Sequence, residues 1–313
     1  MRILVYLPLL LPLLAPLGAQ QLAERCEPRL ATWLLTASAL VLAVASTVSL
    51  GVLAATGLIR MPLFAGLGHW SVSSARRDDP TELSVALLAG LLLGGALVMV
   101  VRMFWRRIRS LAAAALDAAC MPAREGLVVV DDPAPDAFAL PGLPGRVVVS
   151  SGMLHTLDES EHGILLAHER AHLAAHHYAF VALAQLGAAA NPLLRPLAAA
   201  VTYTTERWAD ENAAAVTGDR ARVARAVGKA ALAARDAAVR SRLPGAALGI
   251  FGRRRGPLAA AGPVPRRVAA LLAPPPGRRP VLACATAVVL FVAAWSSAEA
   301  AHDLHELLET IGA

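Results

Sequence analysis

The sequence predicts a mostly α-helical membrane protein of about four spans with a cytoplasmic α+β domain. Hydrophobic residues make up 57% of the 313 residues and charged residues only 17%, whereas soluble proteins carry roughly a quarter charged residues. The apolar residues are gathered in long uncharged runs, as membrane spans require. Before the last of these runs, short β-branched segments bounded by Gly, Pro and Asp indicate strands in a non-membrane part.

The same composition excludes several classes of protein. A disordered chain needs low hydrophobicity and high net charge, and the three cysteines, Cys26, Cys120 and Cys284, are too few and too far apart for a disulfide framework. The net charge of +6 would suit nucleic-acid binding. However, the arginines cluster at the ends of apolar runs, and no helix-turn-helix pattern accompanies them, so we expect no direct contact with nucleic acid.

Four apolar runs are the expected spans, at residues 3–19, 30–59, 83–101 and 280–298. The first run is short and contains three prolines, so a cleaved signal peptide is the alternative to an anchor. The expected organisation is therefore an N-terminal membrane region at 1–109, a folded domain at 110–240, a Pro/Gly/Arg-rich linker at 241–279, and a last span with a short outer tail at 280–313.

Arginine positions predict the orientation. One cluster follows the third span and another precedes the last span, which is typical of the cytoplasmic side. A cleaved signal peptide would place both clusters outside, so we expect an uncleaved anchor. The protein is then a multi-pass plasma-membrane protein whose folded domain faces the cytoplasm. The clusters are Arg102, Arg106, Arg107 and Arg109, and Arg266, Arg267, Arg278 and Arg279.

The folded domain is expected to be mixed α and β. Two β-branched runs at 126–130 and 146–150 are expected strands, and 137–140 is a third candidate. A helical pattern follows, with Thr156 or Asp158 as its N-cap.

Within that helix stands the run His168-Glu-Arg-Ala-His172. A spacing of four residues puts both imidazoles on one helical face, where both can bind one zinc ion. Glu169 lies beside the first histidine and can accept a proton from the attacking water. The pattern therefore predicts a metal-dependent hydrolase.

A third zinc ligand is needed, because a catalytic zinc usually takes three protein ligands. The candidates are His176, His177 and a later carboxylate. His176 lies one more turn along a straight helix, about 6 Å further from the metal, and is expected to be a neighbour rather than a ligand. Glu206 is preferred, since Asp210 one turn later can orient a ligating histidine.

The apolar segment 179–201 is long enough to span the membrane. A single crossing would separate His172 from Glu206, which could then not share one metal. Asn191-Pro192 and Arg195-Pro196 interrupt the segment midway. We therefore expect two short helices that dip towards the bilayer and return.

Three runs carry a resemblance to a known family. They are Asp136-Ala-Phe-Ala-Leu-Pro-Gly, Gly145-Arg-Val-Val-Val-Ser-Ser-Gly-Met-Leu and Leu166-Ala-His-Glu-Arg-Ala-His. Together they resemble the integral-membrane gluzincin metallopeptidases, both the HtpX/CAAX-prenyl-protease type and the BlaR/MecR antirepressor type. Asn191-Pro192-Leu193 followed by Glu206-Arg-Trp-Ala-Asp-Glu resembles the second type in particular.

The resemblance implies a zincin-like peptidase domain with one zinc ion. It implies that His168, His172 and Glu206 bind the metal, that Glu169 is the general base, and that Asp210 orients a ligand. The BlaR/MecR sensors also carry a large extracellular penicillin-binding domain. Only about fifteen residues follow the last span here, so direct β-lactam acylation is not expected.

Two further features of a peptidase site are expected. Tyr203 and His176 are candidate oxyanion stabilisers, with His177 and Arg207 as alternatives. An extended substrate is expected to pair with an edge strand at 146–150 or 137–140, although the three valines at 147–149 are expected to be core residues.

The expected function is that of a zinc-dependent membrane endopeptidase that acts on a protein substrate. The antirepressor resemblance indicates regulatory cleavage of a cytoplasmic winged-helix repressor, and the HtpX resemblance indicates membrane-protein quality control instead. From another class, the rival is a non-catalytic membrane scaffold with a vestigial metal site. Membrane lipid is an expected partner in every case.

Overall fold

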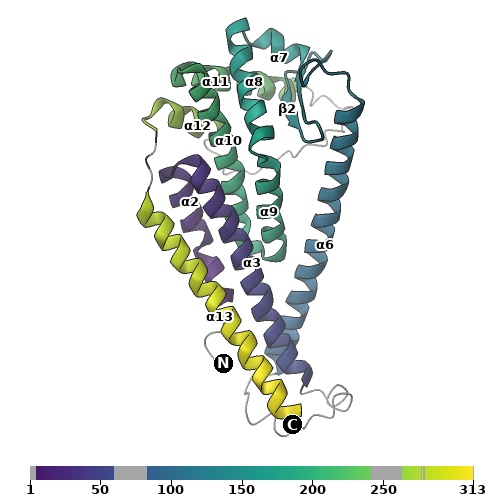
Figure 1. Ribbon diagram of the computed structural model, residues 1–313, viewed down its shortest axis with the longest axis vertical. Helices are drawn as coiled ribbons and strands as arrows, with labels where there is room; N and C mark the ends of the chain where they lie inside the picture. The colour runs from purple at the N-terminus through teal and green to yellow at the C-terminus, as the bar shows by residue number, and fades with distance from the viewer. Residues whose placement is uncertain (1–4, 60–82, 241–262, 276, 278, 313) are drawn as a thin grey trace. The chain divides into compact units, whose positions relative to one another are not determined.

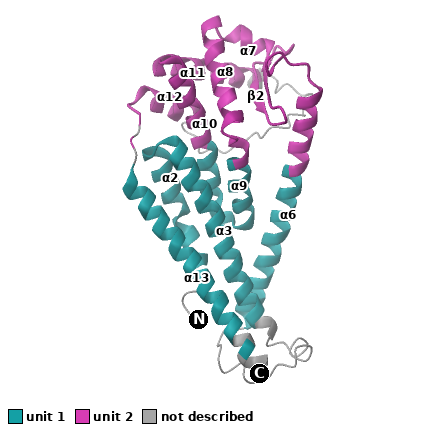
Figure 2. Ribbon diagram, in the orientation of Figure 1, with its two compact units in different colours: residues 1–107, 180–202, 278–313 teal, residues 108–179, 203–277 magenta. Residues whose placement is uncertain are grey.

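The structure is a computed structural model, and it describes residues 5–59, 83–240, 263–275, 277 and 279–312. Residues 60–82, between the second and third expected spans, and residues 241–262 of the expected linker lie outside the described residues. The chain divides into two compact units: residues 1–107, 180–202 and 278–313 form the first, and residues 108–179 and 203–277 form the second (Figure 2).

Among the described residues of the first unit, three helices are long and apolar enough to cross a membrane (Figure 1). They are α3 (Pro28–Ile59), α6 (Leu83–Cys120) and α13 (Pro280–Gly312). Side chains such as Leu91 on α6 and Phe291 on α13 are 74% and 66% exposed, which in water would be costly. The apolar surface is thus consistent with a membrane protein. Both α6 and α13 continue as helix beyond the spans expected at 83–101 and 280–298.

The first apolar run does not form one long helix. It consists of α1 (Leu7–Leu10), the 3₁₀ helix η1 (Leu11–Leu14) and α2 (Ala15–Arg25). Each piece begins at or next to a proline, because proline cannot donate the backbone hydrogen bond that a continuous helix needs. The span expected at 3–19 is therefore not among the candidate spans.

The segment expected to dip and return forms α9 (His177–Ala190), the 3₁₀ helix η2 (Pro192–Leu194) and α10 (Arg195–Thr217). The interruption falls at Asn191, as expected. Within the first unit, Asn191 Nδ2 donates to Ser46 Oγ on α3 at 3.1 Å. A Cβ atom on Gly187 would lie 2.6 Å from the carbonyl oxygen of Ala39, so only glycine permits this approach of α9 to α3.

The second unit contains a three-stranded sheet of β1 (Leu127–Val130), β2 (Ala137–Leu140) and β3 (Arg146–Ser150). All three expected strands are present. Their order is β1-β3-β2, with β1 parallel and β2 antiparallel to β3. The central position of β3 corrects the expectation that 146–150 offers a free edge: both of its edges are paired, and β2 alone of the two candidates is an edge strand.

Helices cover both faces of this sheet, so the consecutive valines of β3 are all buried. Val148 packs on Ala118 of α6. Val147 and Val149 face the opposite way and pack on residues of α7 (Ser151–Thr156) and α8 (Glu159–Ala174). Asp158 caps α8 with a capping box, in which Glu161 reaches back to the Asp158 amide.

Two further helices complete the second unit, α11 (Arg220–Arg240) and α12 (Pro263–Leu272). The expectation of a linker over 241–279 is wrong for the residues of α12. Leu271 of α12 is buried with Val223 and Ala224 of α11. Arg220 donates to the carbonyl oxygens of Ala270 and Leu271, so the C-terminal end of α12 is held by a cation.

Candidate metal centre

Helices α8 and α10 bring three potential metal ligands together. His168 and His172 lie one turn apart on α8, and their Nε2 atoms are 3.2 Å apart. Glu206 approaches from α10: its Oε2 is 3.7 Å from His168 Nε2, and its Oε1 is 3.6 Å from His172 Nε2. The three ligand atoms all lie within 4.8 Å of one another.

These separations fit a zinc ion. Ligand atoms at about 2.0–2.2 Å from a tetrahedral zinc lie about 3.3–3.6 Å from one another, which is close to the 3.2–3.7 Å between the three side chains. Two imidazole nitrogens and a carboxylate oxygen are also a donor set that zinc accepts, with room for a fourth ligand. The geometry therefore suits the metal that the sequence predicts.

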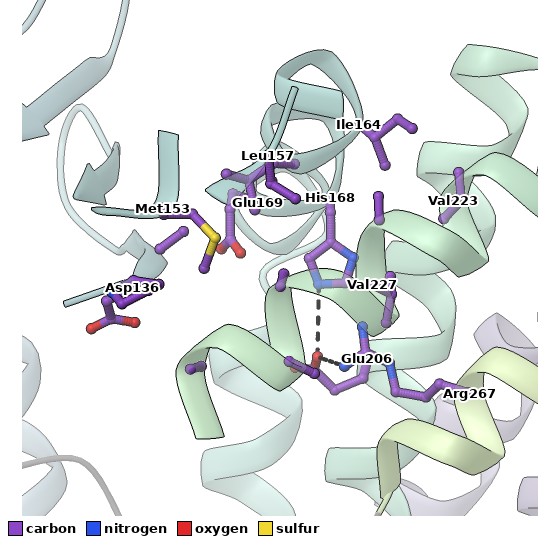
Figure 3. A pocket seen from close by; sticks show the side chains of 17 residues that line it. Asp136, Met153, Leu157, Ile164, His168, Glu169, Glu206, Val223, Val227 and Arg267 are labelled. Atoms are coloured by element: carbon purple, nitrogen blue, oxygen red, sulfur yellow. Dashed lines mark ion pairs between the residues drawn. The ribbon is translucent and has the colours of Figure 1, made fainter. Parts of the chain in front are cut away.

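A charged network supports the His168 side of this centre. Asp210 Oδ1 lies 3.1 Å from His168 Nδ1. Arg267 of α12 donates two hydrogen bonds to the Asp210 carboxylate, at 2.6 and 2.7 Å, and its third nitrogen lies 2.8 Å from Glu206 Oε2. Figure 3 shows His168, Glu206 and Arg267 joined by ion pairs. One guanidinium thus holds both carboxylates of α10 in a paired geometry that arginine favours.

The His172 side is supported by a neutral group instead. His177, at the start of α9, places its Nδ1 3.0 Å from Nδ1 of His172. Its ring also lies against Trp208 of α10, with ring centroids 4.7 Å apart. Because Trp208 follows α9 in the chain, this contact shows that α10 comes back to the start of α9, as a site formed by both His172 and Glu206 requires.

His176 does not continue the histidine face, because α8 ends at Ala174. Its backbone has a φ of +52°, in the left-handed region that L-residues rarely adopt. The His176 side chain is exposed and lies near Tyr178, with ring centroids 5.9 Å apart. The turn that moves His176 away is the one that brings His177 to His172.

Glu169 is buried beside the ligands, with 8% of its surface exposed. Burial raises the pKa of its carboxyl to about 7, although the positive charge of His168 and a hydrogen bond from the Ala139 amide oppose the shift. A carboxyl with a pKa near neutrality suits a group that must both accept and return a proton.

The two histidines differ in their proton affinity when no metal is bound. Burial alone would lower the pKa of His168, but Asp210 and Glu206 outweigh burial and raise it to about 10. Burial lowers the pKa of His172 to about 4 and that of His177 to about 3. Desolvation would raise the pKa of the half-buried Glu206 and of the buried Asp210, but hydrogen bonds and nearby cations hold the pKa of each carboxyl below its usual range.

A cavity of about 220 Å³ adjoins the ligands (Figure 3). His168, Glu169, Glu206 and Arg267 line it, together with Asp136, the residue before β2. The remaining lining is apolar and comes mainly from α8 and α11. Tyr203, one turn before Glu206 on α10, packs its ring under the guanidinium of Arg266 at 4.4 Å.

Arg267 and the supporting contact of His177 are the two functional features that sequence reasoning missed. In the sequence, Arg267 belongs to the arginine cluster that marks the cytoplasmic side. The run Pro263-Val-Pro265 before an apolar segment is the signal in the sequence for a helix start at this point. His177 was among the candidates for ligand or oxyanion stabiliser, but only the turn at His176 directs it to His172.

The model of peptidase family M48 matches residues 102–194, under a third of the chain. This part of the chain is similar to peptidase family M48. The resemblance expected from the sequence is thereby confirmed. The matched residues include α8 with both histidines but end before Glu206, so Glu206 is a candidate ligand from its position in the structure alone. No curated protein and no solved structure matches the chain significantly.

Proposed function

We propose that the protein is a zinc-dependent membrane endopeptidase. The observation that carries this proposal is the arrangement of His168, His172 and Glu206 around one point, with the buried carboxyl of Glu169 beside them. In such a site zinc polarises the peptide carbonyl and lowers the pKa of the attacking water.

The side chains of this protein then have separate tasks. Glu169 takes a proton from the attacking water and gives it to the leaving amine, which breaks the peptide bond. Asp210 accepts a hydrogen bond from Nδ1–H of His168, which fixes the tautomer that leaves Nε2 free to bind a metal. His172 donates a hydrogen bond from its Nδ1–H to Nδ1 of His177, with the same effect on its own Nε2.

The substrate is proposed to pair with the edge strand β2. Asp136 hydrogen-bonds to Ser150 at the end of β3, so its backbone faces β3. In an antiparallel pair the next residue, Ala137, therefore directs its N–H and C=O towards the free edge. Ala137 also lines the cavity, which places an extended peptide beside Glu169. Tyr203 is retained as the proposed oxyanion stabiliser, because His176 turns away from the ligands.

The test compares Glu169→Gln with wild type in detergent-purified protein. We expect Glu169→Gln to bind one zinc ion per chain and to lose cleavage of casein and of its own chain by at least about 100-fold. Glu159→Gln, an exposed glutamate on the same helix, is the matched control and should cleave normally. Undiminished proteolysis by Glu169→Gln would exclude the mechanism, and partner binding that needs neither zinc nor Glu169 would favour the non-catalytic scaffold.

We further propose that the site faces the cytoplasm of a plasma-membrane protein with about four spans. The arginine clusters support this orientation. Reporter fusions after Arg109, after Leu248 and at Ala313 test it: the first two should report cytoplasm and the last the outside. An outer location at either of the first two positions would overturn the proposal.

The substrate is proposed to be a cytoplasmic winged-helix repressor, with quality control of membrane proteins as the second candidate. The Asn191-Pro192 break and the final span after the peptidase domain support the first. Repressor integrity should differ between cells with wild type and with Glu169→Gln. If a repressor encoded beside this chain is processed identically in both, quality control becomes the better proposal.

A further inference from the structure

The cavity beside the metal centre is lined mostly by apolar side chains. Its charged or titratable lining residues are Asp136, His168, Glu169, Glu206 and Arg267. The rest of the wall is formed by apolar residues, among them Met153, Leu157, Ile164 and Leu165, and by one face of α11. A peptide whose scissile bond lies at the ligands would therefore extend a neighbouring side chain into an apolar space.

Helix α11 lines the cavity with two valines and four alanines. Among the alanines, Ala226, Ala230 and Ala234 recur at a spacing of four residues, as one helical face requires, and Ala231 lies beside them. Ala230 also packs with the cluster that contains Met153 and Leu157. Because alanine projects so little, this face of α11 determines how deep the cavity is.

The volume of the cavity indicates what it can hold. An apolar cavity of about 150 Å³ accepts a benzene molecule, and this cavity measures about 220 Å³. A leucine, methionine or phenylalanine side chain fits such a space and buries apolar surface there, whereas alanine would leave most of it unfilled. A charged side chain would meet no counter-charge among the apolar wall residues.

We propose that this cavity binds a bulky apolar side chain next to the cleaved bond, and that Ala230 on α11 is a specificity-determining residue. The inference rests on the proposed endopeptidase function and narrows its substrates to peptides with Leu, Met or Phe at that position. The edge strand β2 aligns the peptide backbone through Ala137, and the α11 wall selects the side chain. Ala230 is not one of the proposed metal ligands, and it packs with the cluster that contains Met153 and Leu157, so its substitution should leave zinc binding unchanged.

The first experiment maps cleavage sites in β-casein by mass spectrometry. Wild type should cut with Leu, Met or Phe enriched at one position beside the cleaved bond. Ala230→Leu fills the cavity and should lower cleavage at those sites at least about tenfold relative to sites with Ala or Ser. Ala234→Leu, at an exposed position of the same wall, should shift the profile less and serves if Ala230→Leu fails to fold. Ala221→Leu, an exposed alanine of α11 away from the cavity, is the matched control.

The second experiment separates this inference from the proposed function, because it needs no catalysis. Zinc-loaded Glu169→Gln protein is titrated with two blocked tetrapeptides that differ only in one Phe or Ala. The Phe peptide should bind at least about tenfold more tightly, and the preference should disappear in Glu169→Gln/Ala230→Leu. Equal binding of both peptides, or a wild-type cleavage profile in Ala230→Leu, would overturn the inference. Preferential binding without any cleavage by wild type would overturn the proposed function alone.

Discussion

His168 and His172 lie one turn apart on the same helix, yet their surroundings are opposite in character. Behind His168 stand Asp210 and Arg267, a buried carboxylate and a guanidinium joined by two hydrogen bonds. Behind His172 stands the neutral ring of His177. The pKa of His168 is accordingly raised to about 10, and that of His172 is lowered to about 4.

This difference between the two histidines limits the net charge of a site that could hold a metal cation. Asp210 brings a negative charge into a buried place, where an unpaired charge is costly, and Glu206 brings a second one to a half-buried position beside it. Arg267 offsets part of it, and the neutral partner at His172 adds none. We therefore expect the Asp210–Arg267 pair behind His168 to contribute more to the stability of the protein than His177 behind His172. Each supporting group orients the histidine beside it.

The largest effect is expected for Arg267→Met. This change removes one of the two cations that contact Asp210, which is 1% exposed, and leaves only His168 beside the carboxylate. Breaking a buried pair costs up to about 3–5 kcal/mol. The metal-free protein should unfold at a clearly lower temperature or denaturant concentration in detergent. Arg225→Met, an exposed arginine on α11, removes the same charge and should unfold like wild type. Equal stability of Arg267→Met and Arg225→Met would show that the charged side is not structural.

An intermediate effect is expected for Asp210→Asn. The amide cannot hold the Nδ1 proton of His168 as a carboxylate does, and the loss of such a group typically weakens metal binding by about 10- to 100-fold. Competition with a chromophoric zinc chelator measures the change. Asp236→Asn, on α11, is a control that should bind zinc as wild type does. Unchanged zinc affinity in Asp210→Asn would mean that His168 needs no carboxylate behind it.

The smallest effect is expected for His177→Phe. Phenylalanine keeps the contact with Trp208 but removes the partner of His172 Nδ1, and a neutral hydrogen bond contributes only about 0.5–1.5 kcal/mol. Zinc affinity in the same competition assay should fall by about 2- to 12-fold, less than in Asp210→Asn. The comparison between the two sides fails if His177→Phe weakens zinc binding as much as Asp210→Asn does.

Much of the peptidase site could be predicted from local patterns. The spacing of His168 and His172 follows from the 3.6-residue period of a helix, and Asp158 is capable of capping that helix wherever it packs. The Asn191-Pro192 step breaks the following apolar segment, because proline disfavours a helical conformation in the residue before it. The strands at 137–140 and 146–150 follow from their composition and bounding residues in the same way.

The missed features depend on contacts between segments that are distant in the sequence. Strand order decided that 146–150 lies in the middle of the sheet, since the composition of a strand does not show which neighbours pair with it. Arg267 stands 57 residues after Asp210, and a short run between prolines resembles a linker until its apolar side is buried on α11. The left-handed turn at His176 redirected the histidines that follow α8.

The sequence by itself determined that this protein has membrane-compatible helices, a run of residues similar to peptidase family M48 and a mixed α and β domain, because each depends on composition or on a spacing of a few residues. Only the tertiary structure decided that Glu206 lies beside the two histidines, that Asp210 and Arg267 form a charged network with them, and that β2 and α11 border the cavity. Those features depend on contacts that buried charges and apolar faces make between separate helices. The packing of the chain in three dimensions determines which residues make these contacts.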